Sequence, residues 1–509
     1  MHTDTERAGG PDDEASSGRA SALRIEREEF RRLGHALVDA IAEFLERVPD
    51  RPVTTAATPA EVQAILDAGA PLPDEGMAPG ALLDSAARLL FDHSLLNGHP
   101  RFFGYITSSP TPIGMLGDLL AAAVNPNVGA WRLSPIASEI EAQTVRWIAE
   151  LLGYPTSCGG LLVSGGNMAN IVGLFAARAA IAGATVRSAG MQSTARRLRV
   201  YASAETHTWL QKGADLAGLG TDAVHWIETD DELRMNVSAL RDAIVRDLRA
   251  GERPMMVVGT AGSVSTGAID PLREIAEVCR AANVWLHVDG AYGAFAAAVP
   301  GAAPALDALA LADSVAVDPH KWLYAPLEAG CVLVRDESKL RDAFAYHPPY
   351  YRFGQAAVNY VDLGPQNSRG FRALKVWLAL RQVGRQGYVR SIAQDIALSR
   401  RMHARVAAHP ELEPGLQSLS ISTFRYVPPR LRAHVGTAET ERYLNTLNEE
   451  LLERIQNSGA LFLSNAVVRG RLLLRACIVN FNTGASDVDA VPELVARMGR
   501  EVDAELRAD

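Results

Sequence analysis

The sequence predicts an α/β fold in which a large domain with a mostly parallel sheet is followed by a smaller α+β domain. The length of 509 residues exceeds one ordinary core, at ~150 residues per domain. Between about residues 98 and 385, short runs that are apolar on both faces alternate with helical stretches, as expected of parallel strands buried between helices. From about residue 386 this alternation stops. We therefore predict a large domain over 98–385 and a small domain over 386–509.

The chain before residue 98 has a different character. Residues 1–20 are polar and acidic without an apolar core, which predicts a disordered tail and not a signal peptide. Residues 21–97 form an N-terminal helical segment: one amphipathic helix ends before Pro49, and Thr58 caps a second with Pro59 at its first position. Its apolar residues find no local surface to cover, so we expect this segment to pack on a partner subunit.

Five apolar runs in the large domain predict strands, and each is followed by a turn or helix. They are GGLLVS (159–164), RLRVYAS (197–203), RPMMVVGTAG (253–262), NVWLHVDG (283–290) and DSVAVDPH (313–320). In the small domain, Ser486 and Asp489 have the spacing of a capping box before a last helix, with Asp in place of Glu or Gln.

Composition excludes several classes of protein. The net charge of −9 and pI of about 5.8, without a basic run, argue against a nucleic-acid partner. The four cysteines are widely spaced and read as free thiols, so we expect no disulfide and no metal site. No apolar run is long enough to span a bilayer, and we predict a cytoplasmic protein with no membrane partner.

Ligands of open α/β sheets bind at the carboxyl ends of the strands, and the turn Ser164-Gly165-Gly166-Asn167 lies at such an end, before a helix. Glycines let backbone N–H groups approach an anion, and a helix start favours negative charge. An ordinary tight turn explains the same residues equally well. The loop is therefore a candidate phosphate site only if other candidate residues lie at the same edge.

Three further residues follow predicted strands at the same edge. Asp289 ends a buried strand, where a carboxylate needs a cation or donors; a helix cap is the alternative. His207 follows another strand and could stack on a flat ring, although a lone histidine is more often structural. Lys321 lies in VAVDPHKWLYAP, an apolar context that is unusual for a surface lysine.

The chain avoids lysine: only four of its 50 basic residues are lysines, and the rest are arginines. A retained lysine can supply what a guanidinium cannot, a nucleophilic amine that forms a Schiff base with an aldehyde. A phosphate cradle, a carboxylate for a ring nitrogen and an amine for an aldehyde together fit pyridoxal 5′-phosphate (PLP).

From about Gly98 to its end the chain resembles the group II PLP-dependent amino-acid decarboxylases, which include aromatic-L-amino-acid and glutamate decarboxylases. The segments SGGNMAN (164–170), THTW (206–209), HVDGAYGAFA (287–296) and DPHKW (318–322) carry the resemblance. It implies PLP fold type I, as in aspartate aminotransferase, and a homodimer. It also implies site roles: Lys321 bonds to PLP, Asp289 holds the pyridine nitrogen, and His207 stacks on the ring. The remaining cofactor residues would be Gly165, Gly166, Asn167, Ala291, Asp318 and His320.

The chain departs from the family's pattern at two cofactor positions. Asn167 replaces the usual Ser or Thr, and Val264 replaces a hydroxyl residue. For the substrate we predict contacts from Tyr105, Trp131 and Arg475. The two aromatic residues favour an aromatic amino acid, whereas Arg475 suits a second carboxylate.

Counting back from Phe371, a family landmark, places Tyr360 at the position of the tyrosine that protonates the substrate Cα. Relatives that make aldehydes have Phe there, so Tyr360 favours simple decarboxylation to the amine. The alternatives are that Tyr360 only packs and that Tyr350 or Tyr351 is the donor.

The predicted activity is thus that of a PLP-dependent carboxy-lyase whose small-molecule substrate is an L-amino acid, with an aromatic one slightly favoured. An aminotransferase on the same fold stays open, because Arg475 could bind a substrate carboxylate in an aminotransferase as well as in a decarboxylase. An aldehyde synthase on the same fold is a further alternative. A PLP-binding scaffold without activity is the alternative from another class.

Overall fold

The computed structural model describes residues 21, 23–347 and 357–508, so the predicted tail, Tyr350 and Tyr351 lie outside the described residues. By its contacts the chain divides into two compact units, one made of residues 1–51 and 57–94 and the other of residues 52–56 and 95–509. Among the described residues, no helix is both long and apolar enough to cross a bilayer.

The first unit contains helices α1 (Arg27–Arg47), α2 (Pro59–Leu66) and α3 (Pro79–His93), with a 3-10 turn at Val48–Asp50. The predicted cap is confirmed, because the Thr58 side chain accepts from Glu61 N and the Glu61 carboxylate accepts from Thr58 N. Phe44 of α1 stacks on Phe91 of α3 with ring centroids 4.2 Å apart. Large apolar side chains nevertheless stay exposed in this unit: Leu23, Phe30, Leu66, Leu72, Leu82 and Leu90.

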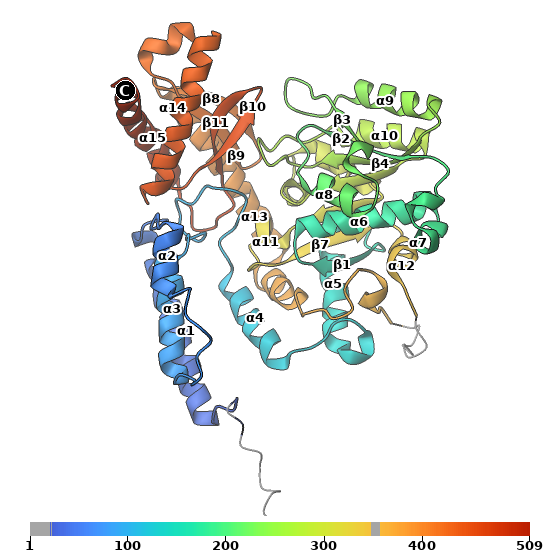
Figure 1. Ribbon diagram of the computed structural model, residues 1–509, viewed down its shortest axis with the longest axis horizontal. Helices are drawn as coiled ribbons and strands as arrows, with labels where there is room; N and C mark the ends of the chain where they lie inside the picture. Colours follow the sequence, from blue (N-terminus) through green and yellow to red (C-terminus); the bar gives the residue numbers. More distant parts are fainter. Residues whose placement is uncertain (1–20, 22, 348–356, 509) are drawn as a thin grey trace, which may run out of the picture. The chain divides into compact units, whose positions relative to one another are not determined.

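The second unit is built on a mostly parallel seven-stranded sheet (Figure 1), counted over the described residues, in the order β1-β7-β6-β5-β4-β2-β3. Its strands are β1 (Gly159–Val163), β2 (Leu198–Ser203), β3 (Val224–Ile227), β4 (Arg253–Thr260), β5 (Trp285–Asp289), β6 (Ser314–Val317) and β7 (Gly330–Val334). β7 runs antiparallel to both of its neighbours, β1 and β6, and the other strand pairs of this sheet are parallel. All five predicted runs are strands, which confirms the mostly parallel α/β class.

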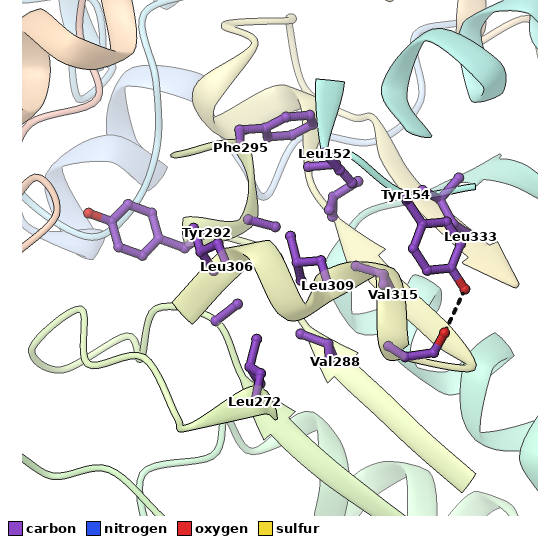
Figure 2. Close-up of a cluster of buried hydrophobic side chains, with 14 of the residues drawn as sticks. Leu152, Tyr154, Leu272, Val288, Tyr292, Phe295, Leu306, Leu309, Val315 and Leu333 are labelled. Carbon is purple, nitrogen blue, oxygen red and sulfur yellow. Dashed lines mark hydrogen bonds between the residues drawn. The ribbon is translucent and has the colours of Figure 1, made fainter. Parts of the chain in front are cut away.

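Helices cover both faces of this sheet. On one face α6 (Gly166–Ala182) and α8 (Trp209–Leu216) pack on it, and on the other α5 (Pro135–Leu151), α9 (Val237–Arg249) and α10 (Leu272–Ala282) do. Figure 2 shows part of the second layer, where Leu272 and Leu309 lie near Val288 and Val315 of the sheet. This double cover explains why the strands are apolar on both sides.

The C-terminal part forms a smaller antiparallel sheet in the order β10-β11-β9-β8, with strands β8 (Leu412–Ser418), β9 (Ile421–Tyr426), β10 (Ser464–Val468) and β11 (Arg471–Cys477). Helices α13 (Ala373–Ala408), α14 (Ala438–Asn457) and α15 (Ala485–Glu505) pack around it. The long α13 is interrupted at Gly384, whose φ of 66° is not helical.

The predicted capping box of the last helix is wrong in register. Helix α15 begins two residues earlier, and the Asp487 carboxylate accepts from Gly484 N at 2.9 Å. Asp489 instead pairs with Arg401 and Arg405, because the helix turns its side chain toward α13.

Short elements complete the second unit. The α-helices are α4 (Pro112–Val124), α7 (Thr185–Ala189), α11 (Pro319–Trp322) and α12 (Ser338–Phe344); the 3-10 helices span Trp131–Leu133, Met191–Ser193, Thr221–Ala223, Gly293–Ala298, Pro304–Leu311, Tyr360–Asp362 and Pro429–His434.

Candidate active site

A cavity of about 330 Å³ lies at the carboxyl ends of β2, β4, β5 and β6. It brings together residues predicted from separate segments: Tyr105, Gly166, Asn167, His207, Asp289, Ala291, Asp318, Lys321 and Arg475. The edge rule for open α/β sheets thus predicted that these residues lie together at one edge of the sheet.

Lys321 belongs to the short helix α11, which follows β6 directly. Its Nζ lies 2.9 Å from Oδ2 of Asp318, and the Asp318 side chain is only 3% exposed. The other Asp318 oxygen, Oδ1, has no hydrogen-bond partner among the described residues. The buried carboxylate thus holds the lysine amine at the cavity wall and still has capacity for another donor.

The glycine turn before α6 is packed too closely for any side chain. A Cβ on Gly166 would come within 2.6 Å of Asp318 Oδ2 and 2.9 Å of the Ala291 side chain, while Gly165 has a φ of +114°. Gly165 also lies against the His320 ring, whose Nδ1 is 2.8 Å from the Ala329 carbonyl oxygen. The turn therefore presents bare backbone at the start of a 17-residue helix, which suits an anion.

Asp289 ends β5 and is 7% exposed. Its Oδ2 accepts a hydrogen bond from Trp209 Nε1 at 2.8 Å, and its Oδ1 accepts one from Ala291 N at 3.2 Å. These donors offset the cost of burying the carboxylate, which also lines the cavity.

His207 lies in the turn between β2 and α8. Its Nδ1 accepts from Trp209 N at 3.2 Å, which leaves Nε2 as the protonated nitrogen of the neutral ring. The pKa of His207 is lowered, chiefly because the surrounding protein desolvates the ring and also because of the Lys321 charge, although Asp289 opposes this effect. A neutral ring is the form suited to stacking.

Arg475 enters the cavity from β11 of the smaller sheet and is 2% exposed. Its guanidinium donates to Ser464 Oγ at 2.7 Å and to the Tyr105 carbonyl at 3.1 Å, while its Nε has no partner among the described residues. Burial lowers the pKa of this guanidinium. A buried cation with only neutral partners is suited to a carboxylate.

Four predicted residues are not among those that line the cavity. Gly165 and His320 lie beside its lining, next to Gly166 and Lys321, whereas Trp131 and Tyr360 have other partners. Trp131 donates its indole N–H to Glu139 at 2.8 Å and is not among the lining residues, so its predicted substrate contact is not supported. Tyr360 is 1% exposed, its hydroxyl points to the Ser138 carbonyl at 3.4 Å, and the Arg369 guanidinium lies 4.6 Å from its ring centroid. Tyr360 thus packs in the core among the described residues, and its hydroxyl does not line the cavity.

Several lining residues were not singled out from the sequence, among them Asn170, Glu205, Thr260, Ser265, Ser464 and Asn465. Glu205 precedes His207 by two residues, so its place after a strand could have pointed to it. Burial raises the pKa of Glu205. Ser464 and Asn465 begin β10 of the smaller sheet, and nothing in their local sequence marks them.

The residues present fit PLP. The bare backbone at Gly165–Gly166 can take a phosphate, Asp289 can accept from a protonated ring nitrogen, and Lys321 offers the amine for the aldehyde. All three line or border one cavity, as the chemistry requires.

Comparisons with known proteins agree with this site. The family described as "pyridoxal-dependent decarboxylase conserved domain" matches residues 62–417. The chain is 32% identical to the aromatic-L-amino-acid decarboxylase of Bacillus atrophaeus, over 94% of this chain and 97% of that one. It is 30% identical to a 4-hydroxyphenylacetaldehyde synthase of Rhodiola rosea, over 92% and 94%. The crystal structure of Oryza sativa TDC with PLP and tryptamine superposes with a TM-score of 0.86 at 27% identity, covering 95% of this chain and 99% of that one.

Proposed function

The chain belongs to the pyridoxal-dependent decarboxylase family, and we propose from that membership that it converts an aromatic L-amino acid into the corresponding amine and CO2. The observation that carries the proposal is the meeting of Lys321, Asp289, His207 and the Gly165–Gly166 turn at one cavity.

Bound PLP supplies an aldehyde carbon that bonds to amines and a protonated ring that accepts the electron pair released at the substrate Cα. Lys321 would hold the cofactor through its amine and later displace the product. Asp318, 2.9 Å from that amine, would take up the proton that the ammonium must lose. Gly165, Gly166, Asn167 and His320 would surround the phosphate.

The protein decides which Cα bond breaks by orienting the substrate. With PLP bound, residues that hold the substrate carboxylate in the reactive orientation would favour its loss as CO2. His207 would stack on the ring as a neutral imidazole and fix the plane of the ring. Asp289 would keep the ring nitrogen protonated, which makes the ring an electron acceptor.

An aromatic substrate is supported by the cavity and by the relatives. Tyr105 lines the cavity with its ring 6.0 Å from that of Phe462, and Arg475 beside it can bind a carboxylate. The Bacillus relative is named for aromatic L-amino acids, and the Oryza structure contains tryptamine.

An aldehyde synthase is the second candidate, because the Rhodiola relative is named for that activity. Such an enzyme also releases CO2 but yields an aldehyde in place of the amine. With Tyr360 in the core, its hydroxyl no longer favours either outcome.

We further propose a homodimer in the cytoplasm. Helix α4 exposes Leu116, Leu119, Leu120 and Val124, an apolar surface of the kind that subunit interfaces cover. All four cysteines are free, which suits a reducing compartment. Sedimentation velocity would test the dimer. Wild type should sediment as a dimer, and Leu119→Asp should dissociate to monomers at a higher protein concentration than wild type does. A monomeric wild type would contradict the proposal.

The decisive experiment uses pure PLP-loaded protein with single L-amino acids. Aromatic and hydroxylated aromatic acids should release CO2 in step with one amine, identified by mass. Acidic amino acids are the control for the role of Arg475. Aldehyde with CO2 would support the second candidate, and a keto acid without CO2 would refute decarboxylation.

A further inference from the structure

The carboxylate that faces the cofactor site is held from behind by a buried tryptophan. Trp209 is fully buried, and its Nε1 donates to Asp289 Oδ2 at 2.8 Å. Trp209 is not among the residues that line the cavity, whereas Asp289 is. The hydrogen bond from Trp209 therefore fixes a cavity-lining carboxylate, although Trp209 itself does not line the cavity.

The indole is held in place from two sides. Trp209 is the first residue of α8, and its ring meets His287 edge-to-face at 5.7 Å. His287 is itself fixed, because Nε2 lies 2.7 Å from Asn170 Oδ1 and Nδ1 lies 2.8 Å from Ser314 Oγ. Burial lowers the pKa of His287 to about 4, so this ring is neutral near pH 7 and adds no competing charge.

We propose that Trp209 is a positioning residue that orients the Asp289 carboxylate toward the place of the pyridine nitrogen. The inference rests on the proposed function, since it assigns a role within the same site. Trp209 Nε1 and Ala291 N together hold both carboxylate oxygens, so the side chain reaches the cavity in one orientation. A carboxylate fixed in this orientation would present an oxygen to the N–H of the pyridine ring, and that hydrogen bond favours the protonated ring nitrogen.

Removal of the indole N–H should have two measurable effects. Asp289 Oδ2 would be left buried without this donor, which weakens its preorganisation for PLP, and we expect about tenfold lower PLP affinity. A carboxylate that is free to turn would also lose its hydrogen bond to the ring N–H, which favours the unprotonated nitrogen. A packing role alone could lower the affinity, but it would not move that proton.

The test compares Trp209→Phe with wild type and with Trp377→Phe. Trp377 also loses an indole donor in this change, to Gln143 Oε1 at 2.7 Å, but lies outside the cavity lining. Cofactor-stripped protein is titrated with PLP by visible absorbance, and the ring nitrogen of ¹⁵N-labelled PLP is observed by NMR. We expect weaker binding and a shift toward the unprotonated nitrogen in Trp209→Phe alone.

A second variant keeps the test valid if Trp209→Phe fails to fold. Site-specific 3-benzothienylalanine at position 209 keeps the size and shape of the ring but replaces N–H with sulfur, and should give the same two effects. Wild-type affinity and an unmoved nitrogen signal in this variant would overturn the inference. Failure of wild type itself to bind PLP would instead refute the proposed function.

Discussion

Two walls of the cavity, named for the roles proposed above, differ in the structural elements that supply their residues. The cofactor wall consists of Gly166, His207, Asp289 and Lys321, and each of these ends or follows a strand of the parallel sheet. The substrate wall consists of Tyr105, Ser464, Asn465 and Arg475, which come from a loop and from two strands of the smaller sheet. Sequence reasoning identified the first wall almost completely and the second only in part.

The difference follows from topology. In a parallel sheet each strand ends at the same edge, so a position just after a strand predicts a place in the site. Ser464 and Arg475 face each other because β10 and β11 pair in one antiparallel register, which places these two residues opposite each other. No local pattern encodes the approach of that hairpin to Tyr105, so the substrate wall needed the folded structure.

The largest expected effect is on the cofactor wall. Lys321→Ala removes the amine that bonds to PLP, and we expect loss of turnover and of the visible absorption of the bound cofactor. Absorbance of purified protein and CO2 release check both. Lys339→Ala, a change at a half-buried lysine that pairs with Asp342 and does not line the cavity, is the control. Normal turnover in Lys321→Ala would refute the whole scheme.

On the substrate wall, Arg475→Met should weaken substrate binding and leave PLP binding unchanged. Loss of the buried guanidinium removes a charged donor, and we expect kcat/KM to fall roughly 30-fold, about 2 kcal/mol, with PLP affinity unchanged. Ser464→Ala removes only a supporting contact and should have a smaller effect. If Arg475→Met instead releases PLP, the two walls do not act separately.

A buried histidine behind the cofactor wall should make the fold sensitive to acid. The pKa of His287 is about 4 in the folded state and about 6.5 unfolded. Its contribution to stability is therefore full above pH 6.5 and is lost as the pH falls toward 4, about 2 kcal/mol between pH 7 and 5.

Urea unfolding at pH 7 and pH 5 would measure this contribution. The glutamine of His287→Gln cannot titrate. The free energy of unfolding should therefore fall less between pH 7 and pH 5 in this variant than in wild type, by about 2 kcal/mol. Asp270 and Asp395, whose pKa values are raised by burial to about 6 and about 7, act in the opposite direction but are present in both proteins. Equal losses in both proteins would contradict the assignment.

The smallest effect is expected at Tyr360, outside both walls. Tyr360→Phe removes a hydroxyl whose hydrogen bond to Ser138 is 3.4 Å long, and kcat should stay within about twofold of wild type. Mass identification of the product is the measurement. Loss of amine with gain of aldehyde would return Tyr360 to a catalytic role.

The sequence by itself determined the sheet and the cofactor chemistry. Runs apolar on both faces specified buried strands, and the scarcity of lysine made Lys321 conspicuous. It failed at Ser486, because the helix begins two residues earlier. It did not show that Tyr360, placed by counting from Phe371 through a segment without periodicity, is buried away from the cavity.

Only the tertiary structure decided which side chains share the cavity and which are enclosed. Trp131 and Tyr105 are both aromatic residues outside the parallel sheet, yet only Tyr105 lines the cavity, because its segment lies against the Ser464 hairpin. Trp209 follows His207 by two residues, but its hydrogen bond to Asp289 joins residues that are 80 positions apart in the sequence. Local patterns report burial and chain direction, whereas such contacts depend on how distant elements pack.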